Sequence, residues 1–222
     1  MTIDTEDLLN SILKSLDRID YIKPEDIPNI DLYMDQVTTF MDSRLKSTVR
    51  DEKEDRILTK TMINNYAKND LLPPPIKKKY SKEHVLLLIF IYYFKGILSI
   101  GDIQMLLNPI TEAFFGKENG MKLEDVYREV FTLEKPEVEL LKKDVVDKFK
   151  KSKETFQDVA GKDKEFLQMF SMICMLSFDV YVKKLLIEKL LDGYVEENAK
   201  AAGQKAAKQR EARSKEKAGK NE

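Results

Sequence analysis

The sequence predicts an all-α protein, with a helical head followed by a helical C-terminal region. Apolar residues recur at the three- and four-residue spacing of amphipathic helices through most of the 222 residues. No convincing strand pattern interrupts them, apart from a short wing-like stretch at residues 72–80. Hydrophobic residues make up 42% of the chain and charged residues 35%, and the mean hydropathy is -0.43. This composition is typical of a soluble, folded chain with one sizeable core or two small ones.

Two helices are predicted before the middle of the head, with prolines between them. Residues 5–19 carry apolar side chains at helical spacing, namely Leu8, Leu9, Ile12, Leu13, Leu16 and Ile19. The segment "KPEDIPN" ends this pattern, because proline lacks the amide hydrogen that a continuing helix needs. A second helix fits Ile30 to Leu45, with one face formed by Ile30, Tyr33, Met34, Val37, Phe40 and Met41. The charged linker "KSTVRDEKEDR" follows it.

A short third helix is predicted over residues 60–69. Thr59 is a suitable N-cap, and Leu58 and Ile63 are placed as a hydrophobic staple. At about 100° per residue, Met62, Ile63 and Tyr66 point to one side. The opposite side carries polar residues, namely Lys60, Thr61, Asn64, Asn65 and Lys68.

A stiff segment and a very apolar helix come next. The prolines at 73–75 end the short helix and favour an extended backbone. Ser81 can cap a helix over residues 82–97, which is apolar nearly all round and is therefore expected to be buried. Ser99 and Asp102 form a capping box for another helix, and the "NP" pair at 108–109 predicts its end.

The pattern stays helical beyond Gly116. The stretches "KLEDVYREVFTLE" and "EVELLKKDVVDKFKKSKETF" read as amphipathic helices, and residues 164–195 as a long helix that is apolar on most sides. From Ala199 the chain is rich in Lys, Ala, Gly and Gln, and it either frays or extends the last helix. We therefore predict four parts: an N-terminal amphipathic helix (1–27), a head (28–110), a helical region for dimerisation or ligand sensing (111–198) and a basic, flexible tail (199–222).

Charge is segregated along the chain although the net charge is only -1. Acidic residues outnumber basic ones over residues 1–55. Residues 56–82 reverse this balance, since a single acid, Asp70, is present among Arg56, Lys60, Lys68, Lys77, Lys78, Lys79 and Lys82. A local excess of lysine and arginine is what a nucleic-acid site in an otherwise neutral protein requires.

The candidate site combines the outward face of helix 60–69 with the lysine run after the prolines. An asparagine can pair with adenine through two hydrogen bonds, and lysine and threonine reach bases or phosphates. Lys77, Lys78 and Lys79, on a stiff segment, can bind phosphates with release of counterions. Tyr66 and Tyr80 are included among the expected DNA contacts. Tyr80 either donates to a phosphate or packs over the helix beneath it. The plainer alternative is a solvated helix face beside a solvated lysine run.

The same residues carry a family resemblance. The stretch "TMINNYAKNDLLPPP…KKKYSKEHVLLLIFIYYFKGILSIGDIQMLL" resembles the DNA-binding head of MerR-type regulators, with a recognition helix, a basic wing and a sloping turn. The matching positions are Tyr66, Leu71, Leu72, Pro73, Lys77, Lys78, Lys79, Tyr80, Ser99, Ile100, Ile103, Leu106 and Leu107. More closely, "DLYMDQVTTFMD", "LTKTMINNY" and "PPPIKKKYSKEH" make residues 28–108 similar to a bacterial family known as domain of unknown function 1836. The resemblance implies a MerR-like winged helix-turn-helix over residues 28–110.

Three functional hypotheses follow. The first is a transcription regulator that reads duplex DNA through the 60–69 helix and the 73–80 wing, as a homodimer with an unknown small-molecule effector. The second is a protein–protein interaction module that keeps the winged-helix scaffold without binding DNA. The third places RNA or an anionic membrane on the basic tail, through Lys200, Lys205, Lys208, Arg210, Arg213, Lys215, Lys217 and Lys220.

Other classes of protein find little support in the sequence. The only histidine, His84, has no nucleophile or carboxylate partner indicated by spacing, and no phosphate-binding glycine loop or metal-ligand spacing occurs. We therefore expect no enzyme, no cofactor and no metal site. The single cysteine, Cys174, is expected to be a small buried hydrophobe. The run "VLLLIFIYYF" is too short to span a membrane, and the start of the chain lacks a signal pattern, so we expect a cytoplasmic protein.

Overall fold

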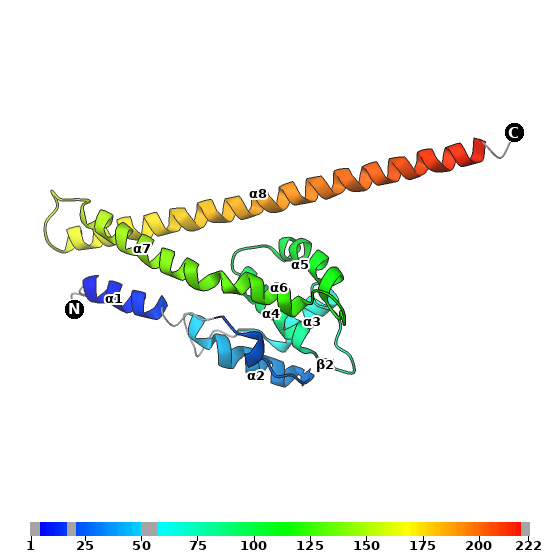
Figure 1. Cartoon of the computed structure of the whole chain (residues 1–222). Helices are drawn as coiled ribbons and strands as arrows, with labels where there is room; N and C mark the ends of the chain where they lie inside the picture. Colours follow the sequence, from blue (N-terminus) through cyan, green and yellow to red (C-terminus); the bar gives the residue numbers. More distant parts are fainter. Residues whose placement is uncertain (1–4, 17–20, 50–56, 219–222) are drawn as a thin grey trace. The chain divides into compact units, whose positions relative to one another are not determined.

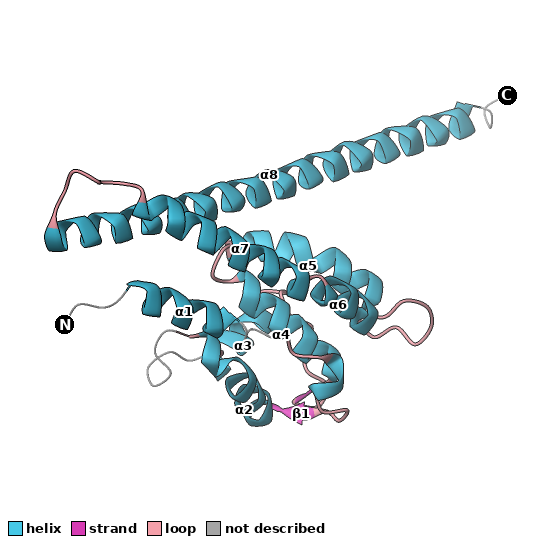
Figure 2. Cartoon of the chain, turned by 60° about the vertical axis from the view of Figure 1, so that its left-hand side comes forward, coloured by secondary structure: helices cyan, strands magenta, loops and turns pink. Residues whose placement is uncertain are grey.

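The computed structural model describes residues 5–16, 21–49 and 57–218, and most of them are helical (Figures 1 and 2). The all-α prediction is confirmed at this level. The chain divides into two compact units, Met1–Val180 and Tyr181–Glu222. Parts of three predictions lie outside the described residues: the end of the 5–19 helix, the linker residues 50–56 with Arg56, and the last residues of the tail.

Helix α4 (Lys82–Phe94) is the centre of the core of the first unit. Every side chain from His84 to Ile91 is buried, as expected for a helix that is apolar on all sides. Such a helix needs neighbours all round, and α5, α6 and strand β2 lie against it. Burial of this helix is confirmed, although it ends at Phe94 rather than at residue 97.

A two-stranded antiparallel ribbon packs beside α4. Strand β1 (Leu32–Tyr33) pairs with β2 (Lys79–Tyr80), with Leu32 opposite Tyr80 and Tyr33 opposite Lys79. The prediction that a helix starts at Ile30 is wrong, because α2 spans Met34–Leu45. The Tyr33 amide donates to Gln36 Oε1 (2.8 Å) and so caps the helix after the strand. Ile30 and Tyr33 are exposed, and the inner face of α2 is Val37, Met41 and Leu45.

Helix α3 (Lys60–Lys68) forms as the sequence predicts. The Thr59 hydroxyl accepts from the Met62 amide (3.1 Å), and the staple residues Leu58 and Ile63 are both buried. At its end the Tyr66 carbonyl accepts from the amides of Leu71 (2.9 Å) and Leu72 (3.2 Å). These bonds turn the chain sharply toward the prolines.

Helix α5 (Ile100–Phe114) begins with the predicted capping box but does not stop at the predicted place. Ser99 Oγ accepts from the Asp102 amide (3.2 Å), and Asp102 Oδ2 accepts from the Ser99 hydroxyl (2.7 Å). Pro109 lies inside the helix, so the stop signal at 108–109 is wrong. Pro109 and Met105, the residue whose carbonyl loses its donor, are both exposed, so water can satisfy that carbonyl.

Contacts after α5 explain why the helix continues. The Phe115 ring packs edge-on against the His84 ring (4.9 Å between centroids), and the Gly116 amide donates to Glu83 Oε2 (2.8 Å). This tertiary packing offsets the cost of an interior proline, which is about 3 kcal/mol.

Helix α6 (Leu123–Thr132) closes the head. It buries Leu123, Tyr127 and Phe131, and the buried Tyr127 hydroxyl donates to the Ile22 carbonyl (2.7 Å). This bond joins Ile22, which precedes the predicted head, to α6, which follows it, so both belong to the same folded region. The boundary predicted at residue 110 falls inside α5. Of the buried hydrophobic side chains that the structure describes, all but Val145 and Leu191 lie between residues 22 and 131.

The remaining helices are α1 (Thr5–Leu16), α7 (Glu134–Lys153) and α8 (Gly161–Ala218). α1 lies along α7 (Figure 1). The start of α8 is held to α7 by Lys148–Asp179 (2.6 Å) and by the Gln168 amide, which donates to the Lys153 carbonyl (2.9 Å). α8 includes residues 199–218, so the described tail backbone extends the last helix, one of the two alternatives considered. Cys174 is exposed, and the expectation that it is buried is wrong, because its side of α8 is uncovered.

Candidate nucleic-acid interface

The outward face of α3 matches its prediction. Lys60, Thr61, Asn64, Asn65 and Lys68 are all exposed, while Ile63 beneath them has 0% exposure. The core therefore fixes one side of a short helix and leaves the other free. A helix with a free polar face has the width and chemistry to enter the major groove of DNA.

The lysine run forms the tip of a tight hairpin. Ile76 and Lys79 exchange two backbone hydrogen bonds (3.1 and 3.0 Å), and the two residues between them have positive φ, 51° at Lys77 and 65° at Lys78. This is the pattern of a type I′ turn, which normally carries asparagine and glycine. Each lysine in the left-handed region costs about 1–2 kcal/mol. The hairpin therefore holds two exposed ammonium groups on a strained, well-defined tip.

Side-chain and backbone contacts join α3 and the hairpin into one surface. Lys60 of α3 forms an ion pair with Asp35, which lies in the first turn of α2 directly after β1. Tyr33 lies two residues before Asp35, and Lys79 Nζ lies over the Tyr33 ring, 5.3 Å from its centroid. Lys79 in turn lies opposite Ile76 at the hairpin. The surface is continuous from α3 across the start of α2 to the ribbon.

Two of the predicted site residues are not on this surface. Tyr66 is 6% exposed and Tyr80 is 2% exposed, and burial raises the pKa of both phenols. The Tyr80 ring packs against His84 (5.5 Å). Of the two roles predicted for Tyr80, the structure shows packing. The prediction that Tyr66 and Tyr80 contact DNA is therefore wrong, since both are core residues.

The basic stretch is split by the structure. Within the described residues, Lys68, Lys77 and Lys78 have no acidic partner, whereas Lys60 is paired with Asp35. Lys82 bonds Glu124 (2.8 Å), so it ties α4 to α6 rather than facing outward. The cations free for a ligand thus lie at the end of α3 and at the tip of the hairpin.

Sequence reasoning missed two exposed side chains of the ribbon, Tyr33 and Ile76. The sequence predicts Tyr33 on the inner face of a helix. In the structure, Leu32–Tyr33 is a strand whose side chains alternate sides, so Leu32 points inward and Tyr33 outward. The signal that could have located Ile76 is its position as the single apolar residue between the prolines and the lysines.

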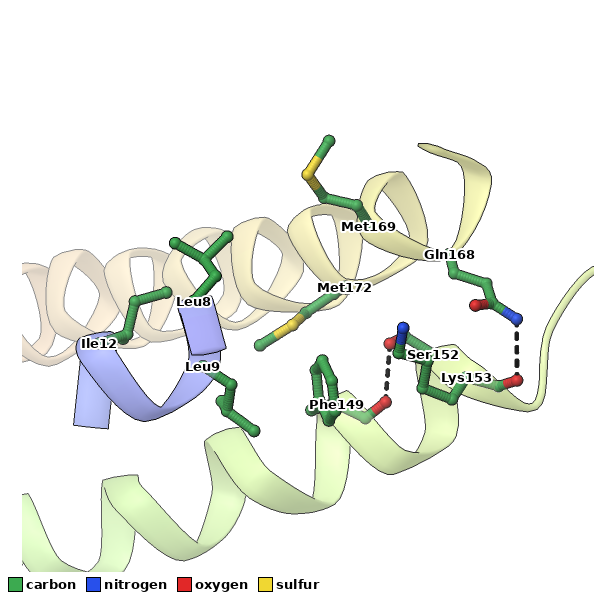
Figure 3. Close-up of a pocket in the computed structure, with 9 residues that line it drawn as sticks. All are labelled: Leu8, Leu9, Ile12, Phe149, Ser152, Lys153, Gln168, Met169 and Met172. Atoms are coloured by element: carbon green, nitrogen blue, oxygen red, sulfur yellow. Dashed lines mark hydrogen bonds between the residues drawn. The ribbon is translucent and has the colours of Figure 1, made fainter. Parts of the chain in front are cut away.

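The structure gives less support to a metal site or a ligand pocket than to the surface formed by α3 and the hairpin. No group of histidine, cysteine and acidic side chains suited to a metal ion occurs in the described ranges. An apolar pocket lies between α1, α7 and α8 (Figure 3) and is lined by Leu8, Leu9, Ile12, Phe149, Ser152, Lys153, Gln168, Met169 and Met172. Two of its polar members already bond backbone carbonyls: Ser152 Oγ donates to the Phe149 carbonyl (2.7 Å) and the Gln168 side-chain amide donates to the Lys153 carbonyl. The pocket lining is therefore mainly apolar.

His84 lies beneath the ribbon and connects it to α4. Its Nδ1 accepts from the Ser81 amide (3.0 Å) and lies 2.8 Å from the Ser81 hydroxyl. Burial lowers the pKa of His84, against weaker opposite effects of the Pro74 and Pro73 carbonyls and of Asp31. The ring is therefore neutral at physiological pH, and it serves the scaffold of the site.

The fold and surface define a helical domain that presents a short polar helix beside a lysine-tipped hairpin. Residues 22–130 match a family model described as "Domain of unknown function (DUF1836)". This match supports the family resemblance predicted from the sequence, and it begins and ends near the residues that the Tyr127–Ile22 bond joins. No curated protein and no solved structure matches the chain. Nowhere in the described residues does a helix have the length and apolar character needed to cross a membrane.

Proposed function

We propose that the head is a MerR-like winged helix-turn-helix and that the protein is a transcription regulator that binds duplex DNA. The observation that carries this proposal is the continuous exposed surface from α3 to the hairpin, linked by Lys60–Asp35 and by Lys79 over Tyr33. The order of α3, a basic hairpin and a buried helix agrees with the order of a recognition helix, a wing and a supporting helix.

The two parts of the surface have different tasks in this proposal. α3 enters the major groove, where Asn64 and Asn65 can each pair with adenine and Thr61 can contact a base or phosphate. Lys60 and Lys68, at its ends, bind phosphates, and Lys77 and Lys78 bind phosphates at the wing. Base contacts supply the sequence preference and the lysines supply most of the salt-dependent affinity.

The proposal includes a homodimer formed by the C-terminal helices. Large apolar side chains on α8 of the first unit are well exposed, including Phe166 (59%), Phe170 (52%) and Ile173 (51%). Contiguous exposed apolar residues are typical of an interaction surface. A two-fold dimer binds an operator with two matching half-sites. A small apolar effector is part of the proposal, and the pocket in Figure 3 is where it would bind.

The alternative is a protein–protein interaction module on the same scaffold. The exposed apolar face of α8 favours it as well, since the partner need not be a second copy. The two functions differ in salt dependence. A complex with a protein partner should persist through nuclease treatment and moderate salt during purification, whereas a complex with DNA dissociates as the salt concentration rises.

The test uses fluorescence anisotropy with a random-sequence duplex and with duplexes selected from the source genome, at low and at about physiological salt. The key variant is Lys77→Asn with Lys78→Gly, which removes both charges but keeps residues that a type I′ turn prefers. Its matched control is Lys150→Ala with Lys151→Ala, which removes the same charge from exposed positions in α7.

We expect the wing variant to bind all duplexes more weakly, with a salt slope lower by about 0.9 for each lost phosphate contact. The α7 control should bind like the wild type. Asn64→Ala should instead reduce the difference between selected and random duplexes by about 1–3 kcal/mol. Absence of binding by the wild type at low salt would refute the DNA-binding function and favour the protein-interaction module.

A further inference from the structure

α6 and α7 are joined so closely that their side chains follow one helical spacing. Leu133, the single residue between them, has helical backbone angles (φ -76°, ψ -16°), and its amide donates to the Val130 carbonyl (3.3 Å). The Glu137 amide donates in turn to the Leu133 carbonyl (3.4 Å). Residues three, four and seven positions apart therefore lie on one face across the junction, as they do within a single helix.

The outer face of this junction carries apolar side chains that the fold leaves uncovered. Leu133 is 63% exposed and Leu140 is 56% exposed, and Val130 and Leu141 beside them are exposed as well. We call these four residues the α6–α7 stripe. A single exposed leucine is ordinary on a protein surface, but several aligned along one helix face are typical of an interaction surface.

Acidic side chains run along the α6–α7 stripe. Glu137 lies between Leu133 and Leu140 on the same face, and Glu129 and Asp147 lie at its two ends. All three acids are exposed. Within the part of the chain that the structure describes, none of the three forms an ion pair. Their charges are therefore open to a cationic partner.

The lysine that follows on this face is already occupied. Lys148 lies seven positions after Leu141 and bonds both Asp144 and Asp179, the latter at 2.6 Å. Two carboxylates thus share one ammonium group, which is largely covered. The outer face between Glu129 and Asp147 keeps an excess of negative charge. A ligand that covers the stripe must bring cations as well as apolar groups, because covering an unpaired carboxylate costs its hydration.

These charges distinguish between the possible occupants of the stripe. Two copies of the stripe packed against each other would set acids against acids, and like charges at an interface oppose association. A phosphate backbone or an anionic membrane is repelled for the same reason. A helix that carries lysine or arginine beside its apolar face is complementary in both shape and charge.

We propose that the α6–α7 stripe docks an amphipathic helix of a different protein, whose apolar side chains pack on Leu133 and Leu140 and whose lysine or arginine side chains pair with Glu137 and Asp147. The partner helix lies alongside α7, because the stripe repeats every seven residues, as the contact face of a coiled coil does. The inference does not rest on DNA binding by α3 and the hairpin.

The experiment measures the binding of two labelled synthetic peptides to the full chain by fluorescence anisotropy at low salt. Each peptide is helical, about three heptads long, and carries leucines at three- and four-residue spacing. Lysines flank the leucines in one peptide, and glutamates replace these lysines in the other. Since the partner is a helix with cations, the lysine peptide represents it and the glutamate peptide is its matched control.

Two variants of the chain change the stripe, and two change matched positions elsewhere. Glu137→Lys reverses the charge in the middle of the stripe, and Leu140→Gln removes an apolar contact. Their controls are Glu118→Lys, at an exposed position in the turn between α5 and α6, and Leu190→Gln, at an exposed leucine of α8.

We expect the lysine peptide to bind the wild type more tightly than the glutamate peptide does. Glu137→Lys should bind the lysine peptide about five- to tenfold more weakly and the glutamate peptide more tightly, a reversal that loss of folding cannot produce. Leu140→Gln should bind the lysine peptide about fivefold more weakly. Both controls should match the wild type.

Three results would overturn the inference, and none involves duplex DNA, so the proposed DNA-binding function is judged separately. The first is equal affinity of the wild type for the two peptides, or no binding of the lysine peptide at about 100 μM. The second is unchanged binding of the lysine peptide by both Glu137→Lys and Leu140→Gln. The third is self-association of the wild type in sedimentation equilibrium that Leu140→Gln abolishes, which would make a second copy the occupant.

Discussion

His84 connects the ribbon, α4 and α5 through one imidazole ring. Its Nδ1 accepts from Ser81 at the start of α4, and its ring packs edge-on against Tyr80 and Phe115. Only the neutral ring, with its proton on Nε2, can accept at Nδ1. The ring is also buried, and burial disfavours its charged form. The fold therefore favours the neutral form, in agreement with the lowered pKa of His84.

This lowered pKa predicts a loss of stability in acid. The unfolded chain binds a proton near the ordinary value of 6.5, but the folded protein does so only at lower pH. Stability from this group is thus complete above about pH 6.5 and is lost as the pH falls below it, by at most about 1.4 kcal/mol per pH unit. Urea unfolding between about pH 7.5 and 5.5 measures this loss.

The control for this prediction is His84→Gln. Glutamine can still accept from the Ser81 amide in a capping box but does not titrate. We expect this variant to be less stable at neutral pH, since it loses two ring contacts, and to show a flatter pH dependence over the same range. An equally steep dependence in the variant would assign the acid sensitivity to other groups.

Asp35 is an acid on the surface proposed to bind DNA. It pairs with Lys60, and both side chains are well exposed, 74% and 60%. Exposed pairs contribute about 0–1 kcal/mol to stability. Asp35→Asn should therefore barely change the free energy of unfolding, while it releases Lys60 and removes repulsion toward phosphates.

We expect Asp35→Asn to raise duplex affinity by about threefold at low salt, with less gain as salt rises. Anisotropy with a random duplex measures it. Glu137→Gln, which changes the same charge at an exposed position in α7, is the control and should not alter binding. An unchanged affinity of Asp35→Asn would place the α2–α3 junction outside the interface.

At the scale of elements, the hairpin before α4 gives a stability prediction that is independent of DNA. Lys77→Asn with Lys78→Gly relieves two left-handed lysines and should raise the free energy of unfolding by about 1–3 kcal/mol. Lys77→Ala with Lys78→Ala removes the same charges but keeps the strain, so its stability should stay near that of the wild type. Urea unfolding of the three proteins tests this, and equal stabilities would argue against the turn geometry.

Most helices were predictable from the sequence, and so was the short strand-like stretch within residues 72–80, but its partner strand β1 was not. α3 and α6 carry an apolar face at helical spacing, and α4 is a continuous apolar run. α3 and α5 also have a recognisable N-cap. β1 has two residues, too few for any period, and its role depends on pairing with Lys79 and Tyr80, far along the chain. For the same reason, the burial of Tyr80 and the exposure of Tyr33 follow from register rather than from local sequence.

The proline inside α5 and the continuity of the candidate site show two further limits of prediction from local sequence patterns. The "NP" pair predicts a helix end. However, α5 continues past Pro109, because Phe115 packs against His84 and the Gly116 amide donates to Glu83 of α4. The outward face of α3 could be predicted because polarity alone identifies it. The continuity of that face with the ribbon depends on the Lys60–Asp35 contact, which joins elements on opposite sides of the charged linker.

At the scale of the whole molecule, the core is unevenly distributed. Among the described residues, α4 is buried along eight consecutive positions from His84 to Ile91, while α7 and the first-unit part of α8 bury few side chains. Local opening costs less where fewer apolar contacts are broken. Amide hydrogen exchange should therefore be slowest in α4, at the limit of global unfolding, and much faster in α7 and in residues 161–180.

The same experiment tests the proposed homodimer when it is done at two protein concentrations. If a second copy covers Phe166, Phe170 and Ile173, protection of residues 161–180 must rise with concentration, because association stabilises the folded form by mass action. Phe170→Asp places a charge in that face and should abolish the concentration dependence while leaving α4 protection unchanged. Protection of 161–180 that is the same at both concentrations in the wild type would exclude a dimer through this face, and the exposed apolar residues would then favour a different protein partner.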